Sequence, residues 1–349
     1  MPDDARAKGR DIVVMGASAG GIDPLIVVLS NLDPKLQVAV FVVVHRSGES
    51  PSTLAKLLAR ATALRVVEVE AATPIVHGTV YLAPAGRHML VKHGHVQVTR
   101  GPKENRHRPA VDPLFRSAAW AYGPRVVGVL LSGRLSDGAA GLWAIRSCGG
   151  VVIIQSPAEA KFAGMPRNAL ETLDPDHCVP AEAIGPLITS LAGTPIARSH
   201  PVPAQVVLES QMAELRNDDI RHVSRIGTLS PFTCPACHGS LWEVDDAEVL
   251  RFRCHTGHAF TAEALVEGIG DSTEEALYSA VRSLQETVAM YQRIANRERG
   301  SGRDKRAASF EARAHKAQMH ATAIARLLQY GIEVLPEEPG EQKQVREGT

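Results

Sequence analysis

Ser18 lies on a glycine-flanked turn that directly follows a short apolar run. The run Ile12–Val14 is rich in β-branched residues and predicts a buried strand, and the turn Gly16–Gly21 (GASAGG) leads into a helix expected to begin near Asp23. A serine at a strand–turn–helix junction is exposed, and its hydroxyl lies near the positive end of the helix. This pattern predicts a nucleophile. A phosphate-binding loop is the alternative that the turn alone leaves open.

A base and an acid for this serine follow two other apolar runs. His45 comes directly after Phe41–Val44, and Asp137 follows the run Val126–Ser132. Because side chains just past the carboxyl ends of parallel strands gather at one edge of a sheet, His45 could take the proton of Ser18 and Asp137 could orient the imidazole. Each residue also has an ordinary role: a histidine at a strand end is often a surface residue, and Asp-Gly is a common turn dipeptide.

The spacing of the glycines argues against a nucleotide site. Gly16, Gly20 and Gly21 miss the G-x-G-x-x-G pattern, no acidic residue ends the second strand, and no phosphate-loop lysine is present. The chain order Ser, His, Asp also differs from the order Ser, Asp, His of α/β-hydrolases. The turn by itself therefore does not assign the chain to that fold.

Apolar runs alternate with helix-like segments over residues 11–192, and these elements must position the three residues. Continuous Val/Ile/Leu runs are typical of a parallel sheet that is covered on both faces. We therefore predict an α/β domain with a doubly wound, mostly parallel sheet and helices on both faces. The expected elements are strands at 12–14, 38–44, 79–83, 126–132 and 151–155, a hairpin at 89–99 turned at Gly94, and helices at 54–60, 113–122 and 139–148.

Three cysteines and a histidine recur at the spacing of metal ligands after this domain. The patterns C-x2-C and C-x3-H are typical of a tetrahedral Zn²⁺ site. His255 and His238 are alternatives for the fourth ligand, and reduced cysteines in a turn-rich module are the alternative without metal. With four protein ligands and no obvious carboxylate, the predicted zinc is structural and holds a zinc-ribbon-like module over 231–262. The predicted ligands are Cys234, Cys237, Cys254 and His258.

The segments around this module predict a linker and a helical hairpin. Residues 193–230 contain a proline-rich stretch, which predicts a linker, and one short helix is expected over 205–216. Apolar residues at heptad-like spacing predict two antiparallel helices over 271–331. Such a stripe is more typical of a core, or of a seam for a partner or a second copy, than of a cofactor site.

Local signals are expected to set the ends of the two helices. Ser272-x-x-Glu275 has the pattern of a capping box, the segment 300–302 (GSG) is the expected turn, and Gly331 is the expected C-cap. The flanking residues, 1–10 and 332–349, are polar and are expected to be disordered.

Charge and composition exclude several classes of function. The 349 residues include 38 Lys plus Arg and 38 Asp plus Glu, so bulk charge does not favour nucleic acid. No apolar run approaches the roughly 20 residues that span a bilayer, and the N-terminus lacks an apolar signal region. Five cysteines are an odd number, and three of them cluster at metal-ligand spacing, which favours a reducing compartment. We expect a cytoplasmic protein without membrane insertion.

Several motifs in the first domain, taken together and in order, resemble the catalytic domain of the CheB chemotaxis methylesterases. The resemblance covers roughly residues 10–190. The motifs are GASAGG at Gly16–Gly21, the strand that ends in His45, YLAPAGRH at Tyr81–His88, NRHRPAVDPLF at Asn105–Phe115, LSGRLSDGAAG at Leu131–Gly141 and FAGMPR at Phe162–Arg167.

The resemblance implies a protein-glutamate methylesterase, a carboxylic-ester hydrolase that needs no cofactor for catalysis. Its substrates would be glutamyl γ-methyl esters on chemoreceptor helices, with release of methanol, and glutamine deamidation is often a second activity. Carried over by position, Ser18 is the nucleophile, His45 the general base and Asp137 its orienting acid, with backbone N–H groups near the turns binding the oxyanion. Further residues that would line the site are Arg106, His107 and Arg108.

The sequence departs from the family pattern in three places. The resemblance begins within about ten residues of Met1, so we expect a stand-alone form without the family's N-terminal receiver domain and its phosphorylation control. Arg134 stands where methionine is frequent, and Arg46, Ser47 and Gly48 replace the Met-Pro-Pro that we associate with the family. We expect these changes to affect the substrate more than the chemistry. A non-catalytic interaction module of a chemosensory-like pathway is the alternative function.

Overall fold

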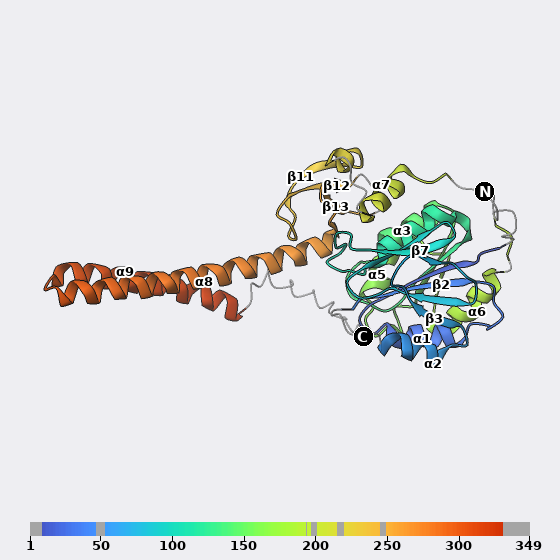
Figure 1. Ribbon diagram of the computed structural model, residues 1–349, viewed down its shortest axis with the longest axis horizontal. Coiled ribbons are helices and arrows are strands. Elements are labelled where there is room, and N and C mark those ends of the chain that lie inside the picture. Colours follow the sequence, from blue (N-terminus) through green and yellow to red (C-terminus); the bar gives the residue numbers. More distant parts are fainter. Residues whose placement is uncertain are drawn as a thin grey trace, which may run out of the picture. The chain divides into compact units, whose positions relative to one another are not determined.

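The computed structural model describes residues 9–46, 53–192, 194–196, 201–214, 220–244 and 249–330 (Figure 1). The chain divides into two compact units, Met1–Gly268 and Ile269–Thr349. The expected disordered segments 1–10 and 332–349, and the expected C-cap at Gly331, fall almost wholly outside the described residues.

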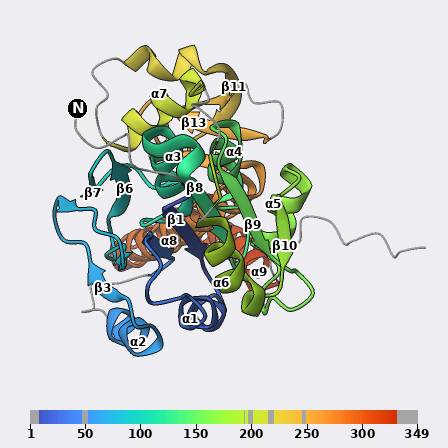
Figure 2. The same ribbon diagram turned by 90° about the vertical axis from the view of Figure 1, so that its right-hand side faces the viewer.

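A parallel sheet of seven strands forms the centre of the first unit, in the order β10-β9-β8-β1-β2-β5-β3 (Figure 2). Its middle strands are buried at every position, as expected for continuous apolar runs with helices on both sides. The prediction of a parallel sheet is therefore confirmed. The strands are β1 (Ile12–Ala17), β2 (Ala39–Val44), β3 (Arg65–Glu68), β5 (Thr79–Leu82), β8 (Val126–Leu130), β9 (Val151–Gln155) and β10 (His177–Val179).

Helices cover both faces of this sheet, which confirms the doubly wound α/β fold. Alternate residues of each strand face opposite sides, so Val13 and Val14 belong to different clusters of the core. One cluster takes side chains from α1 (Ile22–Ser30), α2 (Thr53–Ala61) and α6 (Ala181–Ala192). The other takes them from α3 (Val111–Tyr122), α4 (Ala139–Ser147) and α5 (Gly164–Thr172).

A small antiparallel sheet lies beside α3 in the order β4-β7-β6. Its hairpin turns at Gly94, whose φ of 76° suits a glycine, so the predicted hairpin is confirmed. The sequence did not predict β3, β10, α5 or α6. The strands β3 and β10 have four and three residues and lie at the two ends of the sheet order, and Pro186 lies inside α6. The small sheet consists of β4 (Thr73–Pro74), β6 (His88–Lys92) and β7 (His95–Thr99).

The cysteine-rich segment folds as a four-stranded antiparallel sheet, which we call the ribbon. Its own small core includes Leu241, Phe252 and Phe260 together with the buried cysteines. The preceding helix, α7 (Ala204–Ala213), packs against α3, so the segment expected as a linker carries a docked helix. The ribbon strands are β11 (Gly227–Thr233), β12 (Ser240–Val244), β13 (Arg251–Cys254) and β14 (Ala259–Thr261).

The second unit consists of a helical hairpin, formed by most of α8 (Ala262–Gly300) and by α9 (Asp304–Tyr330). The seam includes Val288, Ala314 and Ala317, with Tyr291 packed against them. The hairpin and its turn are as expected, but the predicted helix start at Ser272 is wrong. Helix α8 already runs continuously from the ribbon, and Thr261 accepts the Ala264 N–H at 3.3 Å, so the Ser272 pattern lies inside a helix.

Candidate active site

The carboxyl ends of three neighbouring strands bring the predicted residues together. Strand β1 pairs with β2 on one side and with β8 on the other, all in parallel. Ser18 comes directly after β1, His45 directly after β2, and Asp137 lies in the loop after β8. This edge of a parallel sheet is where ligands of doubly wound folds bind.

Ser18, His45 and Asp137 form one hydrogen-bonded chain. The Ser18 Oγ lies 2.9 Å from His45 Nδ1, and His45 Nε2 lies 2.6 Å from Asp137 Oδ2. Because an ionised carboxylate only accepts hydrogen bonds, Nε2 carries the proton and Nδ1 is left to accept from the serine. The two ring nitrogens thus exchange the parts that they have in the serine-protease template, whereas the direction of proton transfer is the same.

The serine turn is packed against the loop that follows β8. The backbone N–H of Ser18 donates to the Ser132 carbonyl at 3.0 Å, so this N–H is not available to an oxyanion. Gly133 passes so close that a Cβ atom there would lie 2.9 Å from the Ser18 Cβ and 1.9 Å from the Met165 sulfur. A glycine is therefore required at 133 for the two loops to meet.

Asp137 is 1% exposed and accepts hydrogen bonds at both oxygens. Besides His45, its donors are the Asn105 side chain at 3.0 Å and the Val111 and Asp112 N–H groups at 2.7 and 3.2 Å, which open helix α3. Burial alone would raise the pKa of Asp137, but the hydrogen bond and charge of His45 and the Val111 N–H hold it well below its usual range. The acid of the chain is therefore ionised at neutral pH.

Asp112 lies beside Asp137 and has the opposite protonation state. Burial and the neighbouring charge of Asp137 raise the pKa of Asp112 to about 8. Its side chain is held by Asn105 at 2.9 Å and by the Gly138 and Gly141 N–H groups at 3.0 and 2.7 Å. A pair of carboxyls with separated pKa values is a frequent feature of catalytic sites.

His107 is a site residue whose role spacing could not show. Its ring stacks on His45 with centroids 3.7 Å apart and planes 17° apart. Burial and the facing His45 lower the pKa of His107 to about 4, so it is neutral at pH 7. Neighbouring Arg106 reaches Glu267 at 2.5 Å, and Arg108 donates to the Gly101 carbonyl at 2.9 Å. These two guanidinium groups engage other parts of the chain, whereas the ring of His107 contacts His45.

The sequence did not assign roles to Asn105 and Asp112, although both lie within the NRHRPAVD motif. The residue type at 105 could have indicated a tight loop, because asparagine tolerates the left-handed backbone that a short loop needs. Asn105 has φ 48° and Arg106 has φ 69°.

Arg134 and Arg46 each contact a neighbouring side chain. The Arg134 guanidinium lies 4.8 Å from the centre of the Phe162 ring, and its side chain is exposed. Arg46, directly after the histidine, pairs with Glu68 at 2.7 Å and also reaches the Ala83 carbonyl.

The four predicted metal ligands converge in the ribbon. The ligand atoms of Cys234, Cys237, Cys254 and His258 all lie within 4.8 Å of one another. The Cys237 and Cys254 sulfurs are 3.7 Å apart, and the Cys254 sulfur lies 3.5 Å from His258 Nδ1. A tetrahedral Zn²⁺, with Zn–S of about 2.3 Å and Zn–N of about 2.0 Å, separates such atoms by about 3.8 and 3.5 Å. The residues present fit this ion.

The model of the CheB methylesterase family matches residues 13–188, which contain the whole hydrogen-bonded chain from Ser18 to Asp137. The chain belongs to the CheB methylesterase family. The crystal structure of the Thermotoga maritima CheB methylesterase catalytic domain is similar with a TM-score of 0.50 and 31% identity, covering 52% of this chain and 98% of that one. The resemblance read from the motifs is therefore confirmed.

Curated relatives named protein-glutamate methylesterases are similar to about half of this chain. The relative from Anaeromyxobacter dehalogenans named protein-glutamate methylesterase/protein-glutamine glutaminase 2 is 39% identical over 180 residues, 52% of this chain and 53% of the relative. The protein-glutamate methylesterase FrzG of Myxococcus xanthus is 37% identical over 175 residues, 50% of this chain and 52% of that relative. The match thus spans about half the length of these two relatives. The ribbon and the helical hairpin lie beyond the CheB match.

Proposed function

We propose that this protein is a protein-glutamate methylesterase, which hydrolyses glutamyl γ-methyl esters on a chemoreceptor-type protein to glutamate and methanol. The observation that carries the proposal is the chain of hydrogen bonds Ser18–His45–Asp137 at the ligand-binding edge of a CheB-family sheet. Deamidation of glutamine is a second reaction of the same site, since an amide differs from the ester only in its leaving group.

Asp137 and His45 activate the serine. The carboxylate accepts the Nε2 proton and so orients the ring, while Nδ1 takes the Ser18 proton as the Oγ attacks the ester carbonyl carbon. The imidazolium then protonates the departing methoxide, and methanol leaves a glutamyl ester on Ser18. A water molecule, deprotonated by the same Nδ1, attacks this acyl-enzyme and releases glutamate and the free serine.

The negative charge on the carbonyl oxygen needs donors other than the Ser18 N–H, which the Ser132 carbonyl already occupies. Backbone N–H groups of the glycine-rich turn, at the start of α1, supply this stabilisation in our proposal, and one such donor is typically worth about a hundred- to a thousand-fold in rate. Neutral His107 supports the ring of His45 without adding a competing positive charge.

The ribbon binds one structural Zn²⁺ through its three cysteines and His258. The fit of the ligand distances to a tetrahedral ion supports this assignment. Metal analysis of protein prepared without chelator should find about one zinc per chain. Cys234→Ser should lose it, whereas Cys178→Ser, at an exposed cysteine outside the cluster, should keep it.

We place the reaction in the cytoplasm, with a methylated receptor-type protein as the partner and substrate. The structure has no described helix with the length and apolarity of a membrane span. The helical hairpin contributes self-association or a partner contact in this proposal.

Methanol release from a methylated receptor fragment tests the function. Ser18→Ala should abolish release, while Ser190→Ala, at an exposed serine on α6, should release methanol at the rate of the unchanged protein. Release that persists in Ser18→Ala would remove the catalytic assignment.

A further inference from the structure

Asn105 connects the ribbon to the catalytic residues. Its side-chain NH2 group donates to Asp137 Oδ1 at 3.0 Å and to Asp112 Oδ2 at 2.9 Å. Its side-chain oxygen accepts the backbone N–H of Thr261 at 3.0 Å, across 156 residues of sequence. One buried amide is therefore bonded to the acid of the triad on one side and to strand β14 on the other.

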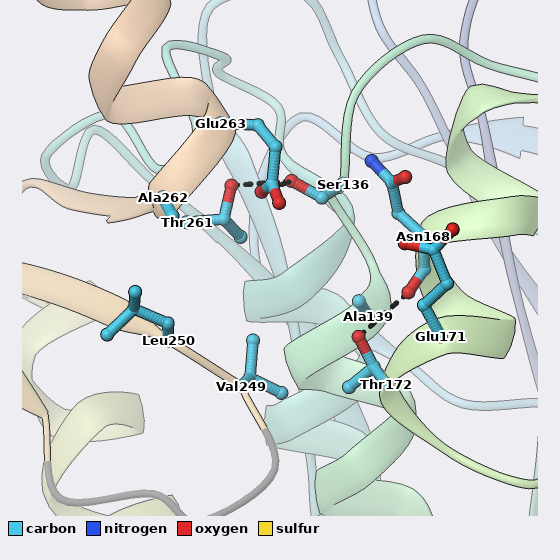
Figure 3. A pocket seen from close by; sticks show the side chains of 10 residues that line it. All are labelled: Ser136, Ala139, Asn168, Glu171, Thr172, Val249, Leu250, Thr261, Ala262 and Glu263. Atoms are coloured by element: carbon cyan, nitrogen blue, oxygen red, sulfur yellow. Dashed lines mark hydrogen bonds between the residues drawn. The ribbon is translucent and has the colours of Figure 1, made fainter. Parts of the chain in front are cut away.

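The backbone of the same loop is bonded to β14 like an added strand. The Asn105 N–H donates to the Ala259 carbonyl at 2.8 Å, and the Ala259 N–H reaches the Lys103 carbonyl at 3.4 Å. The segment before the triad acid is also tied to the ribbon, because Ser136 Oγ lies 2.5 Å from Thr261 Oγ1 and 3.1 Å from Glu263 (Figure 3). Both loops that meet at Asp137 thus contact β14 or the first turn of α8.

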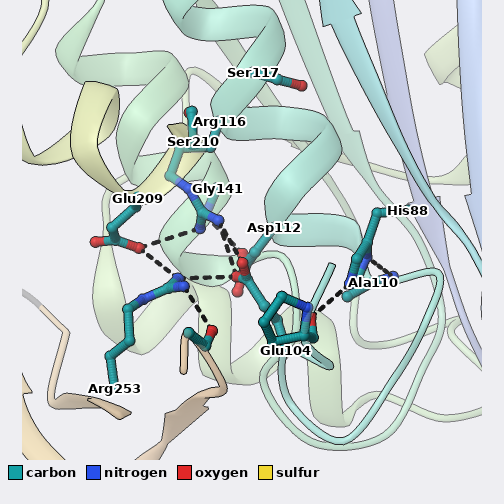
Figure 4. Close-up of polar contacts among 12 residues, drawn as sticks. His88, Glu104, Ala110, Asp112, Arg116, Ser117, Gly141, Glu209, Ser210 and Arg253 are labelled. Carbon is teal, nitrogen blue, oxygen red and sulfur yellow. Dashed lines mark hydrogen bonds and ion pairs between the residues drawn. The ribbon is translucent and has the colours of Figure 1, made fainter. Parts of the chain in front are cut away.

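A buried ionic cluster fixes the loop from the other side (Figure 4). Glu104 is 2% exposed and accepts two hydrogen bonds from Arg116 of α3, at 2.8 and 2.9 Å. Arg253 of β13 approaches Glu104 at 3.2 Å and Glu209 of α7 at 2.9 Å. Removing one member would leave a buried charge without compensation, so the contact depends on every member of the cluster.

The metal ligands flank the hairpin that makes these contacts. Cys254 directly follows Arg253, and His258 directly precedes Ala259. The Cys254 N–H also donates to the His258 carbonyl at 3.0 Å, so the two ligands close the β13–β14 turn. A metal bound by both residues therefore holds strands β13 and β14 together at their turn, and these two strands contact Glu104 and Asn105.

We propose that the ribbon is part of the catalytic apparatus: its metal-clamped β13–β14 hairpin holds Asn105, a positioning residue, against Asp137, so that turnover at Ser18 depends on metal occupancy. This inference rests on the proposed esterase function. The ribbon would otherwise be an appended module whose loss leaves the serine as reactive as before.

The rate of covalent labelling of Ser18 by a fluorophosphonate probe measures this coupling directly, because the probe needs the activated serine and no protein substrate. Zinc-loaded full-length protein should label at least about tenfold faster than protein stripped by a chelator, the size of effect seen when outer supporting residues are lost. Added Zn²⁺ should restore the rate. Far-UV circular dichroism should report a retained sheet, and equal labelling by verified zinc-free protein would overturn the proposal.

Two arginines of the same strand provide a matched pair of variants with the metal in place. Arg253 pairs with Glu209 and also with Glu104, whereas Arg251 pairs with Glu209 at 2.9 Å. Arg253→Lys should therefore slow Ser18 labelling several-fold more than Arg251→Lys, at equal zinc content. Equal rates in both variants and the unchanged protein would overturn the proposal whether or not the stripped protein stays folded.

Asn105→Gly tests the positioning residue itself, because glycine accepts the left-handed backbone at φ 48° and removes the side chain that bonds Asp137 and Thr261. Since Asn105 positions another residue, we expect kcat for methanol release to fall about 10- to 100-fold with KM unchanged. An unchanged kcat would contradict the role. A different outcome separates this inference from the proposed function. If Ser18 labelling slows on zinc removal and in Arg253→Lys, but even the unchanged protein releases no methanol, the proposed substrate is wrong and the positioning role still holds.

Discussion

Two buried clusters of ionisable groups lie next to each other in the first unit, and they compensate their buried carboxyl groups in different ways. At the sheet edge, Asp137 and Asp112 share Asn105 and backbone N–H groups, with the imidazole of His45 as the partner of Asp137. At the ribbon contact, carboxylates are outnumbered by guanidinium groups. The members of this second cluster are Glu104, Glu209, Arg116, Arg251 and Arg253.

The two clusters differ in the protonation state of their carboxyl groups. Where carboxyls lack a guanidinium in direct contact, one of them takes up a proton: the pKa of Asp112 rises to about 8 and that of Asp137 falls well below its usual range. At the ribbon contact both glutamates have lowered pKa values, because the arginines outweigh the burial that would raise them. The first arrangement therefore gives its two carboxyls different protonation states, and the second keeps both glutamates ionised at a charge-dependent joint.

The largest expected effect comes from the two aspartates of the sheet edge. Asp137→Asn should lower kcat for methanol release by about 10⁴-fold, because the amide no longer fixes the Nε2-protonated tautomer. Asp112→Asn should lower it far less, since the hydrogen bonds of Asp112 go to Asn105, Gly138 and Gly141, and the carboxylate that accepts the Nε2 proton is kept. Steady-state kinetics of both variants check this contrast, and equal losses would erase the distinction between the two carboxyls.

A smaller effect, on stability, is expected at the ribbon contact. Glu209→Gln leaves the buried arginines with too little negative charge and should reduce the free energy of unfolding by about 3–5 kcal/mol. Ile153→Val in the apolar core of β9 should cost only about 0.5–1.5 kcal/mol. Urea denaturation monitored by circular dichroism measures both. If the glutamate variant were as stable as the valine variant, the ribbon contact would not be the charge-dependent joint described above.

The smallest effect is a dependence on pH. The pKa of Glu209 in the folded protein is below its usual 4.5, so the unfolded state binds more protons and stability rises with pH. The contribution of Glu209 is complete above about pH 5 and is lost as the pH falls toward and below about 4. Glu209→Gln should flatten the slope of unfolding free energy against pH in this window. An unchanged slope would mean that Glu209 is not ionised in the native protein.

The sequence was sufficient to predict the sheet, the edge and the three residues that meet there. Continuous apolar runs predict parallel strands, and Ser18, His45 and Asp137 each stand just past such a run. Local spacing was also enough to predict which residues cluster in the ribbon, because Cys234 and Cys237, and likewise Cys254 and His258, are close in sequence.

What the sequence could not predict depends on contacts between distant segments. Asn105 and Thr261 are 156 residues apart, and the local sequence around one of them does not predict a contact with the other. The segment around α7 has the composition of a linker, yet Glu209 is 1% exposed because three arginines from elsewhere surround it. The Ser272 capping pattern was a valid local signal that the continuous helix from the ribbon overrides.

Complete labelling of the protein by a fluorophosphonate, with the modified residue located by peptide mass spectrometry, tests the central claim most directly. We predict a single adduct on Ser18, a loss of methanol release in proportion to labelling, and no adduct in His45→Ala. Methanol release that continues in protein fully modified at Ser18, or an adduct on a different residue that abolishes it, would contradict the assignment of Ser18 as the nucleophile.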